Sequence, residues 1–354
     1  MQRTSNYNYL QSQIIAIILG YIIAIIFSMV DYRHIVNSWW IFAAIGLVLL
    51  ILVLFIGINV SGTDDTAWIN LPGGFSFQPS ELVKIVFIIT FSKHLQVLKE
   101  KETLHTIGGF ATLIPHMILP VLLVHLQGDD GTALVFAIMF IIMMFAAGIQ
   151  LRYFLIMGLI VLTAIPIAWN YILNDEHKNR LLALFDLDGN AKTYAWQQFQ
   201  GKVSIASGGL SGYGVGKGSR VASGIVPEQE NDFIFTVAGE ELGFFGCTLL
   251  LLILLLIMIK ILFDAYQSRD DIGRYICIGV FSMIACQTTI NIGMVLGMTP
   301  VIGITLPFFS SGGSSMLSIL ISIGLVQSVY AHKNDIIKTG ILLNNKYKYT
   351  SNLY

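Results

Sequence analysis

Charged residues are scarce in this sequence: Asp, Glu, Lys and Arg together make up 12% of its 354 residues. A water-soluble domain carries about 25% charged residues. Hydrophobic residues make up 55% of the chain, and its mean hydropathy is +0.74. A chain so poor in charge cannot keep its surface in water. The composition therefore excludes a soluble globular protein and indicates that membrane lipids surround most of the chain.

Cysteine is also rare, and its placement excludes two kinds of site. The three cysteines, Cys247, Cys277 and Cys286, lie inside apolar runs without the spacing of a metal site or a disulfide framework. We expect them to be packing residues. A cleavable signal peptide is not expected, because residues 1–12 are polar and the first apolar run is too long. We expect no nucleic-acid partner.

Long apolar runs, by contrast, are abundant. A helix needs about 20 apolar residues to cross the hydrocarbon core of a bilayer. Windows of this kind fall near residues 13–30, 39–59, 79–97, 108–126, 131–149, 153–173, 233–262, 275–297 and 313–331. The sequence therefore predicts an all-α, polytopic membrane bundle of about nine transmembrane helices. It forms a single domain over residues 1–354, with a large extracytoplasmic loop at about 174–232.

The distribution of Lys and Arg predicts the orientation of these helices. Cations gather in three connections: 92–107, 260–274 and the C-terminal tail. They are missing from three others: 60–78, 127–131 and 298–312. Because cytoplasmic loops are enriched in Lys and Arg, the first set is cytoplasmic and the second external, which places the N-terminus outside. The predicted external loop 174–232 breaks the rule with six cations. Either long translocated loops escape the bias, or these cations face an anionic ligand.

Polar residues cluster at the predicted external ends of the helices. An ionisable group at membrane depth costs about 2.5–3.5 kcal/mol and is therefore a functional candidate. After Trp68, Pro79 suits the first turn of a helix. Glu81 and Lys84 lie three residues apart on one helical face and can pair. The alternative is a plain helix start, with a carboxylate near the positive end of the dipole.

Two further acidic positions lie where a loop meets an apolar helix. Asp129 and Asp130 form a short turn between two predicted helices, and their alternative role is to cap the second one. Asp232 lies between a polar loop and the apolar window 233–262. Partial desolvation there raises the pKa of a carboxyl group toward that of a general base. A helix cap is again the alternative.

Glycine and proline mark two irregular segments. The run 207–218 contains six glycines but lacks the Ser or Thr after Lys217 that a Walker A loop needs. So much glycine permits close backbone approach, with N–H groups free to hold an anion; a flexible linker is the alternative. Segment 298–315 contains Pro and Gly that prevent a plain helical hairpin, so we expect a re-entrant loop. His116 and His125 are interpreted as helix-packing or interface residues.

Taken together, these strings resemble the SEDS family of bacterial cell-wall proteins, the RodA, FtsW and SpoVE group. The matching strings, in family order along nearly the whole chain, are residues 78–81 with Lys84, 129–132, 196–200 leading to 207–209, 227–235, 240–243 and 300–315. The resemblance implies ten helices with both ends cytoplasmic. The first helix here aligns with the family's second, so we expect one leading helix to be missing, as a natural short form or a truncated start.

The resemblance also implies an activity. Such a protein is a peptidoglycan glycosyltransferase that polymerises lipid II, a disaccharide-peptide on undecaprenyl pyrophosphate, at the outer face of the bacterial cytoplasmic membrane. Its implied partner is a class B penicillin-binding protein. Two other readings stay open: a flippase that moves lipid II between leaflets, and a non-catalytic scaffold for a cell-wall synthase.

The resemblance assigns roles residue by residue. Asp232 matches the catalytic acid, and Glu81, Lys84 and Asp129 match residues of the same cavity. Lys202 and Arg180 match basic positions more loosely and are expected near the diphosphate. The other expected substrate-binding residues are Trp68, Gln200, Ser207, Gly208, Gly209, Glu228 and Ser310. A divalent cation, Mg²⁺ or Mn²⁺, could assist with the diphosphate, but the sequence contains no dedicated metal-binding motif.

The sequence also departs from the family pattern around the expected site. Glu230 and Asn231 stand where the family usually has His-Thr. Ala67 replaces an Arg, Asp130 a Leu and Ser311 a Tyr. The first departure adds charge beside the expected catalytic acid.

Overall fold

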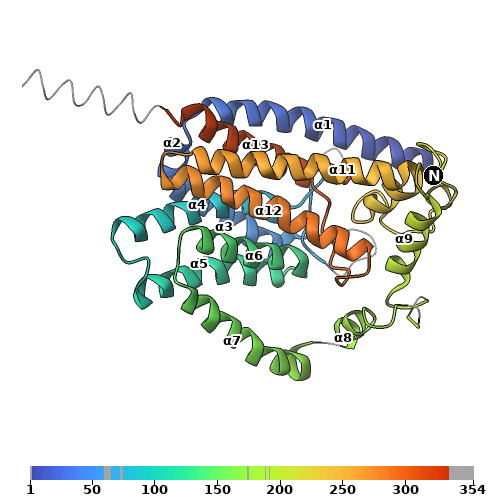
Figure 1. Cartoon of the computed structure of the whole chain (residues 1–354), viewed down its shortest axis with the longest axis horizontal. Helices are drawn as coiled ribbons and strands as arrows, with labels where there is room; N and C mark the ends of the chain where they lie inside the picture. The colour runs from blue at the N-terminus through green and yellow to red at the C-terminus, as the bar shows by residue number, and fades with distance from the viewer. Residues whose placement is uncertain are drawn as a thin grey trace, which may run out of the picture.

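The computed structural model describes residues 2–59, 65–71, 75–173, 175–187, 189–190 and 192–334. Helices dominate the described chain (Figure 1). They are α1 (Gln2–Met29), α2 (Tyr32–Asn37), α3 (Trp39–Ile56), α4 (Pro79–Glu100), α5 (Ile107–His125), α6 (Asp130–Ala146), α7 (Leu151–Ile167), the π-helix η1 (Ala168–Ile172), α8 (Asp175–Leu182), α9 (Trp196–Ser207), α10 (Ser219–Ala222), α11 (Ile234–Gln267), α12 (Asp271–Val295) and α13 (Gly313–His332). A short antiparallel pair, β1 (Ile69–Leu71) and β2 (Phe75–Phe77), precedes α4.

Each of the nine predicted windows coincides with a helix, so the prediction of a polytopic helical bundle is confirmed. Within the described residues, six helices are long and apolar enough to span a bilayer on their own: α3, α5, α7 with η1, α11, α12 and α13. Two more apolar helices are shorter, namely the Gln13–Met29 part of α1 and α6. The ninth window is α4, which carries the charged pair Glu81 and Lys84.

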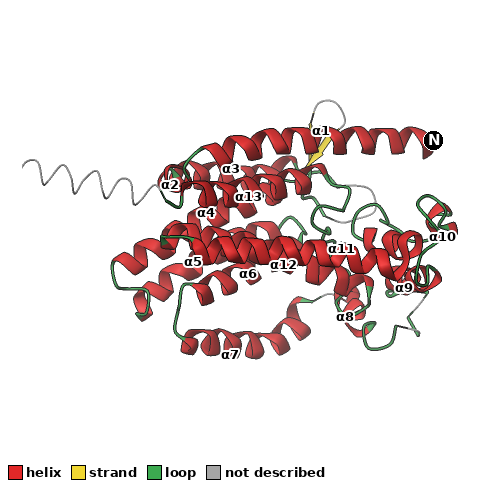
Figure 2. Cartoon of the chain, turned by 45° about the horizontal axis from the view of Figure 1, so that its top comes forward, coloured by secondary structure: helices red, strands yellow, loops and turns green. Residues whose placement is uncertain are grey.

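The helices divide into central and peripheral ones. In α12 and α13, 72% of the apolar stretch is buried, against 6% in α7. Figures 1 and 2 show α7 diverging from the bundle, and its exposed apolar faces suit contact with lipid. The helix α1 lies along α13, where Gly324 permits close approach: a Cβ there would stand 2.5 Å from the carbonyl oxygen of Ala24.

One end of the bundle collects the connections predicted to be cytoplasmic. Arg33 pairs with Asp270 at 3.1 Å, and Lys99 pairs with Asp271 at 2.7 Å. Arg33 also donates to the carbonyl of His332 at 3.1 Å. The segment with α8, α9 and α10, predicted as the large external loop, lies at the opposite end together with the N-terminus (Figure 1). The alternation inferred from Lys and Arg thus matches the grouping of the helix ends.

The three cysteines and His116, which were assigned to packing, behave as predicted. Cys247, Cys277 and Cys286 are buried and free. His116 contacts the ring of Phe91 and the Thr90 hydroxyl on α4, so it packs between helices. His125 is exposed instead, and its Nδ1 lies 2.5 Å from the Asp130 carboxylate at the end of the α5–α6 turn.

Candidate active site

A buried ion pair opens α4. Pro79 occupies the first turn, as predicted, and Glu81 and Lys84 after it are buried in the bundle. Lys84 Nζ lies 2.8 Å from Glu81 Oε1, and the two side chains are 1% and 6% exposed. Glu81 Oε2 is buried without a hydrogen-bond partner among the described residues. Glu81 and Lys84 thus bring a charged, incompletely satisfied group into the bundle, which a plain helix start does not require.

The Asp129 carboxylate joins the start of α4 to the start of α6. Its Oδ1 accepts from the Thr132 N–H at 2.9 Å, which is the predicted helix cap. Its Oδ2 accepts from Gln78 Nε2 at 2.7 Å and from Ser80 Oγ at 3.3 Å. Burial raises the pKa of Asp129, with a smaller contribution from the charge of Glu81. Asp129 therefore both caps α6 and lies beside the Glu81–Lys84 pair.

Asp232 lies in the turn immediately before α11 and does not cap it, since Phe233 is the N-cap residue. Burial, followed by the carboxylates of Glu228, Asp129 and Asp65 in that order, raises its pKa from 3.8 to about 7. With Asp232 itself, these groups come from three separate segments of the chain. The structure therefore brings Asp232 together with Asp129, and through Asp129 with Glu81.

The loop between α12 and α13 forms the floor beside Asp232. Its residues 300–306 have no regular secondary structure, while Ile304 and Leu306 within it are buried. Asp232 Oδ2 is 3.5 Å from the point where a Cβ would stand on Gly303. Irregular backbone of this kind is tolerated at membrane depth only when protein or a cavity surrounds it. The predicted departure from a helical hairpin is confirmed.

The same loop holds the backbone around Asp232. The Ser311 N–H donates to the carbonyl of Glu230 at 2.8 Å, and Ser310 Oγ donates to that of Asn231 at 2.8 Å. Asn291 Nδ2, on α12, donates to the carbonyl of Asp232 at 2.7 Å. Sequence reasoning selected Ser310 but missed Asn291 and Asp65. A lone Asn in an apolar helix, at 291, was the available signal for the first.

The glycine-rich run has a different role from the predicted one. It packs against a break in α11 at Gly243, whose φ and ψ are 66° and −165°. Gly209 accepts from the Phe244 N–H at 2.9 Å, and Tyr213 donates to the Glu240 carbonyl at 3.1 Å. Close backbone approach is thus confirmed, with another part of the chain as the neighbour: a Cβ on Gly208 would stand 2.0 Å from the Gly239 carbonyl oxygen.

The prediction of N–H groups free for an anion is wrong at Gly208, Gly209, Gly212 and Gly214, whose N–H groups all donate to backbone carbonyls. The N–H groups of Gly208 and Gly209 donate to the carbonyls of Ile205 and Ala206, which end α9. Ser207 Oγ likewise donates to the Ser204 carbonyl at 2.7 Å. The physical reason is that a helix end and a helix break both leave orphan backbone groups, and the glycines satisfy them.

Arg220 organises the polar contacts beside this run. Its guanidinium donates to Gln200 Oε1 at 2.5 Å and to Ser204 Oγ at 2.8 Å. The Glu240 carboxylate accepts from the N–H groups of Arg220 and Val221, at 2.8 and 3.2 Å, at the start of α10. The predicted site residue Gln200 is therefore already bound within the protein, and Arg220 is its partner.

The remaining predicted site residues lie nearer the surface. Lys202 is exposed on α9 beside Gly297, which follows α12. Arg180 is exposed on α8. Glu228 is exposed and accepts from Asn231 Nδ2 at 2.7 Å. Trp68 is half-buried, and its carbonyl accepts from the Ile58 N–H at 2.8 Å. The described charges that raise the pKa of Asp232 are the carboxylates of Glu228, Asp129 and Asp65. The expected placement of Lys202 and Arg180 near a diphosphate stays a prediction.

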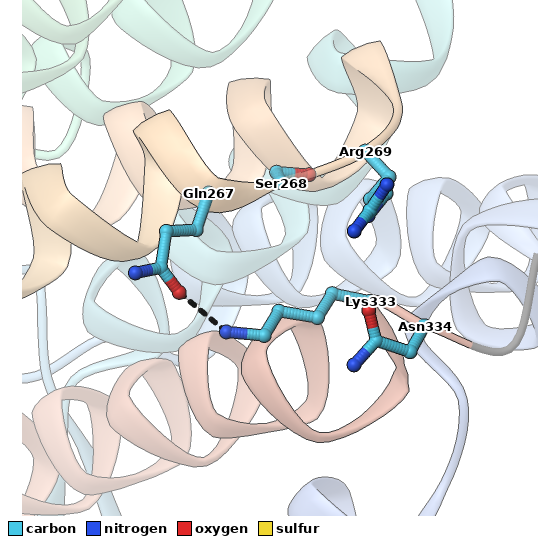
Figure 3. A pocket seen from close by; sticks show the side chains of 5 residues that line it. All are labelled: Gln267, Ser268, Arg269, Lys333 and Asn334. Atoms are coloured by element: carbon cyan, nitrogen blue, oxygen red, sulfur yellow. Dashed lines mark hydrogen bonds between the residues drawn. The ribbon is translucent and has the colours of Figure 1, made fainter.

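A separate pocket lies at the opposite end of the bundle (Figure 3). It has a volume of ≈ 480 Å³ and is lined by Gln267, Ser268, Arg269, Lys333 and Asn334. The Lys333 ammonium donates to Gln267 Oε1 across it. These residues belong to the connections predicted to be cytoplasmic, so the pocket is distinct from the Asp232 site.

Known proteins and solved structures resemble this chain over most of its length. The probable peptidoglycan glycosyltransferase FtsW of Geobacter sulfurreducens is 32% identical over 329 residues, which cover 91% of this chain and 85% of the relative. Stage V sporulation protein E of Bacillus subtilis is 35% identical over 282 residues, covering 79% and 75%.

One solved structure is a chain described under "Structural coordination of polymerization and crosslinking by a peptidoglycan synthase complex". It matches with a TM-score of 0.77 and 26% identity, and the match covers 92% of this chain and 90% of the other. The model of the cell cycle protein family FtsW/RodA/SpoVE matches residues 1–335. These matches show that the chain, a multi-pass membrane bundle, belongs to the FtsW, RodA and SpoVE family.

Proposed function

We propose that this protein is a peptidoglycan glycosyltransferase that polymerises lipid II into glycan strands, with Asp232 as the general base. The observation that carries the proposal is the environment of Asp232, whose pKa burial and three neighbouring carboxylates raise to about 7. A general base works best when its pKa lies near the working pH. The activity named for the FtsW relative supports the same reaction.

The reaction joins two sugars and releases a pyrophosphate. The hydroxyl of the acceptor sugar attacks the anomeric carbon of the donor, and its proton passes to the Asp232 carboxylate. The bond between the anomeric carbon and the pyrophosphate oxygen breaks, so undecaprenyl pyrophosphate leaves with the electron pair. Developing negative charge on that leaving group is stabilised best by fixed cations and hydrogen-bond donors. We assign this task to Lys202 and Arg180.

The buried groups near Asp129 orient the site. Glu81 and Lys84 form a rigid charged pair, and Asp129 links it to Gln78 and Ser80. Because the side chains around them are buried, their positions are set before substrate arrives, which lowers the cost of aligning it. A divalent cation would neutralise the diphosphate. Among the described residues no group of three or more His, Cys, Asp or Glu side chains is placed to hold a metal ion.

We further propose that the site faces the outer leaflet of the bacterial cytoplasmic membrane. The three connections without Lys or Arg supply Asp65, Asp129 and Gly303, which lie around Asp232. The cation-bearing connections 92–107 and 260–274 meet at the other end of α4, through the Lys99–Asp271 pair. The loop 174–232, with its six cations, is the exception. A substrate with a lipid tail suits a site at the bilayer edge. The peptidoglycan synthase complex named for the similar structure supports a second proposal, that a class B penicillin-binding protein cross-links the product.

The test is polymerisation of labelled lipid II by protein purified in detergent. We expect wild type to make glycan strands visible on a gel, and Asp232→Asn to make none. Asp271→Asn is the matched control, because its carboxylate pairs with Lys99 at the opposite end of the bundle. Normal polymerisation by a folded Asp232→Asn variant would disprove the assignment of the base.

The same preparation separates the alternative functions. In vesicles with labelled lipid II in one leaflet, translocation without polymer would identify a flippase. Polymer made only when a penicillin-binding protein supplies the glycosyltransferase activity would identify a scaffold. Either outcome would overturn the proposed enzyme.

A further inference from the structure

A glutamine on the first helix is clamped onto the loop beside Asp232. Gln13 Oε1 accepts from the Gly312 N–H at 3.1 Å, and Gln13 Nε2 donates to the Ser310 carbonyl at 3.4 Å. A carboxamide offers one acceptor and one donor group, which match a carbonyl and an N–H two residues apart. The Gln13 side chain therefore bridges the Ser310 carbonyl and the Gly312 N–H of the loop backbone.

The clamped residues are the ones that hold the Asp232 turn. Ser310 Oγ donates to the carbonyl of Asn231, and the Ser311 N–H donates to that of Glu230. Ser310 Oγ also accepts from the Leu306 N–H at 2.6 Å, so it lies inside a fixed bend. Hydrogen bonds on both sides of Ser310 thus connect α1 to Asn231, the residue next to Asp232.

The position of Gln13 is itself fixed by helix packing. The helix α1 runs along α13, and Ala16, one turn after Gln13, contacts Gly313 at the start of α13. The side chain is partly buried at the point where the apolar part of α1 begins. A polar side chain placed there for solvation alone has no reason to bind both groups of the Ser310–Gly312 backbone.

We propose that Gln13 is a positioning residue for Asp232, which it holds in place through the 310–312 backbone. This inference rests on the proposed function, since it assigns Gln13 a role in placing the general base. A displacement of about 1 Å at a reacting group can lower a rate by ~100-fold. Loss of the clamp lets the loop and the Asp232 turn move together.

The substitution Gln13→Met tests this role, because methionine keeps the length of the side chain and removes both hydrogen-bonding groups. Gln13→Glu is the conservative variant, since its oxygen still accepts from Gly312. Ser28→Ala is the matched control on the same helix: the Ser28 hydroxyl bonds only the Ile25 carbonyl of its own helix at 2.7 Å. Initial rates are measured against lipid II concentration and against pH.

We expect Gln13→Met to lower kcat by about 10- to 100-fold, with little change in KM, and Gln13→Glu to recover part of the loss. The pH–rate midpoint of Gln13→Met moves below that of wild type, because a loosened Asp232 is better hydrated. The groups that face Asp232 are Glu228, Asp129 and Asp65, and none of them is altered. A kcat and midpoint equal to wild type, or the same loss in Ser28→Ala, would overturn the proposal.

Hydrogen exchange gives a readout independent of activity. Gln13→Met should increase amide exchange in both segments 304–312 and 228–233, whereas Ser28→Ala should leave them unchanged. If wild type itself makes no polymer, the proposed function fails while this measurement still tests the clamp. Unchanged exchange in both segments would refute it.

Discussion

The side-chain amide of Asn291 donates a hydrogen bond to the backbone carbonyl of Asp232 at 2.7 Å, and a second one to that of Ile304 at 2.7 Å. One residue near the C-terminal end of the buried helix α12 thus joins the turn before α11 to the irregular loop. The residue is fully buried, so no water competes for these bonds. The backbone around the proposed base is therefore held both by α12 and by the 304–312 loop.

We expect Asn291→Leu to lower both activity and stability. Leucine is similar in size but donates nothing, so it leaves two buried carbonyls unsatisfied at a cost of about 1–3 kcal/mol each. Polymerisation should fall, and the apparent melting temperature in detergent should decrease. Thr163→Val is a suitable comparison, since the Thr163 hydroxyl on α7 bonds only within its own helix and is exposed. Equal activity in wild type and Asn291→Leu would contradict the role of this bond.

Activity should depend on pH through Asp232. Its pKa is raised to about 7, and only the deprotonated form can accept the proton of the acceptor hydroxyl. The rate should therefore rise with pH through a midpoint near 7 and level off above it. Single-turnover rates measured across this range report the group in the bound complex. A profile that is flat between pH 5 and pH 8 would exclude Asp232 as the titrating base.

The same shift predicts a stability effect with a definite sign. Between its ordinary pKa of 3.8 and about 7, folded Asp232 keeps a proton that the unfolded chain has released. Stability therefore falls as pH rises through this window, and the full penalty is present above it. Asn cannot ionise, so Asp232→Asn should melt higher than wild type above pH 7 and lose this advantage below 3.8. A variant that melts lower at high pH would contradict the sign.

The Glu81–Lys84 pair should respond asymmetrically to substitution. Removing Lys84 alone, as in Lys84→Met, leaves a buried carboxylate without its partner at a cost of about 3–5 kcal/mol. Replacing both residues, as in Glu81→Leu with Lys84→Met, should recover most of that stability because neither charge remains. Thermal unfolding of wild type, the single variant and the double variant gives the comparison. A double variant less stable than Lys84→Met would contradict it. Both variants should be inactive.

Substituting Gly324 by a larger residue should disrupt the close packing of α1 on α13. A Cβ there meets backbone atoms of Ala24 at 2.5–2.9 Å, so neither helix can yield by turning a side chain. Gly324→Ala should cost about 1–3 kcal/mol of stability. Gly158→Ala on α7 is the control, because a Cβ at that site meets nothing within 4 Å. It should leave stability unchanged or raise it slightly. Equal melting temperatures for the two variants would refute the contact.

Local sequence patterns were sufficient to predict some features of the site. The three-residue spacing of Glu81 and Lys84 predicts their pairing, because residues three apart share a helix face. A carboxylate at a loop–helix junction predicts partial burial and a raised pKa, which Asp232 shows. For the glycine-rich run the same kind of reasoning predicted a close approach but not its partner. Nothing near residue 208 in the sequence reveals that α11 breaks at Gly243 and needs its backbone groups satisfied.

The amino-acid sequence by itself determined the membrane bundle, the positions of its nine long helices along the chain, the alternation of the helix ends and the family. Each of these depends on local composition or on the order of short strings, because lipid demands about 20 apolar residues per crossing. Only the tertiary structure decided which polar groups meet. Gln13 and Gly312 are 299 residues apart, and Asn291 and Asp232 are 59 apart. Such contacts follow from how whole helices pack and where the connecting loops return, which no window of neighbouring residues encodes.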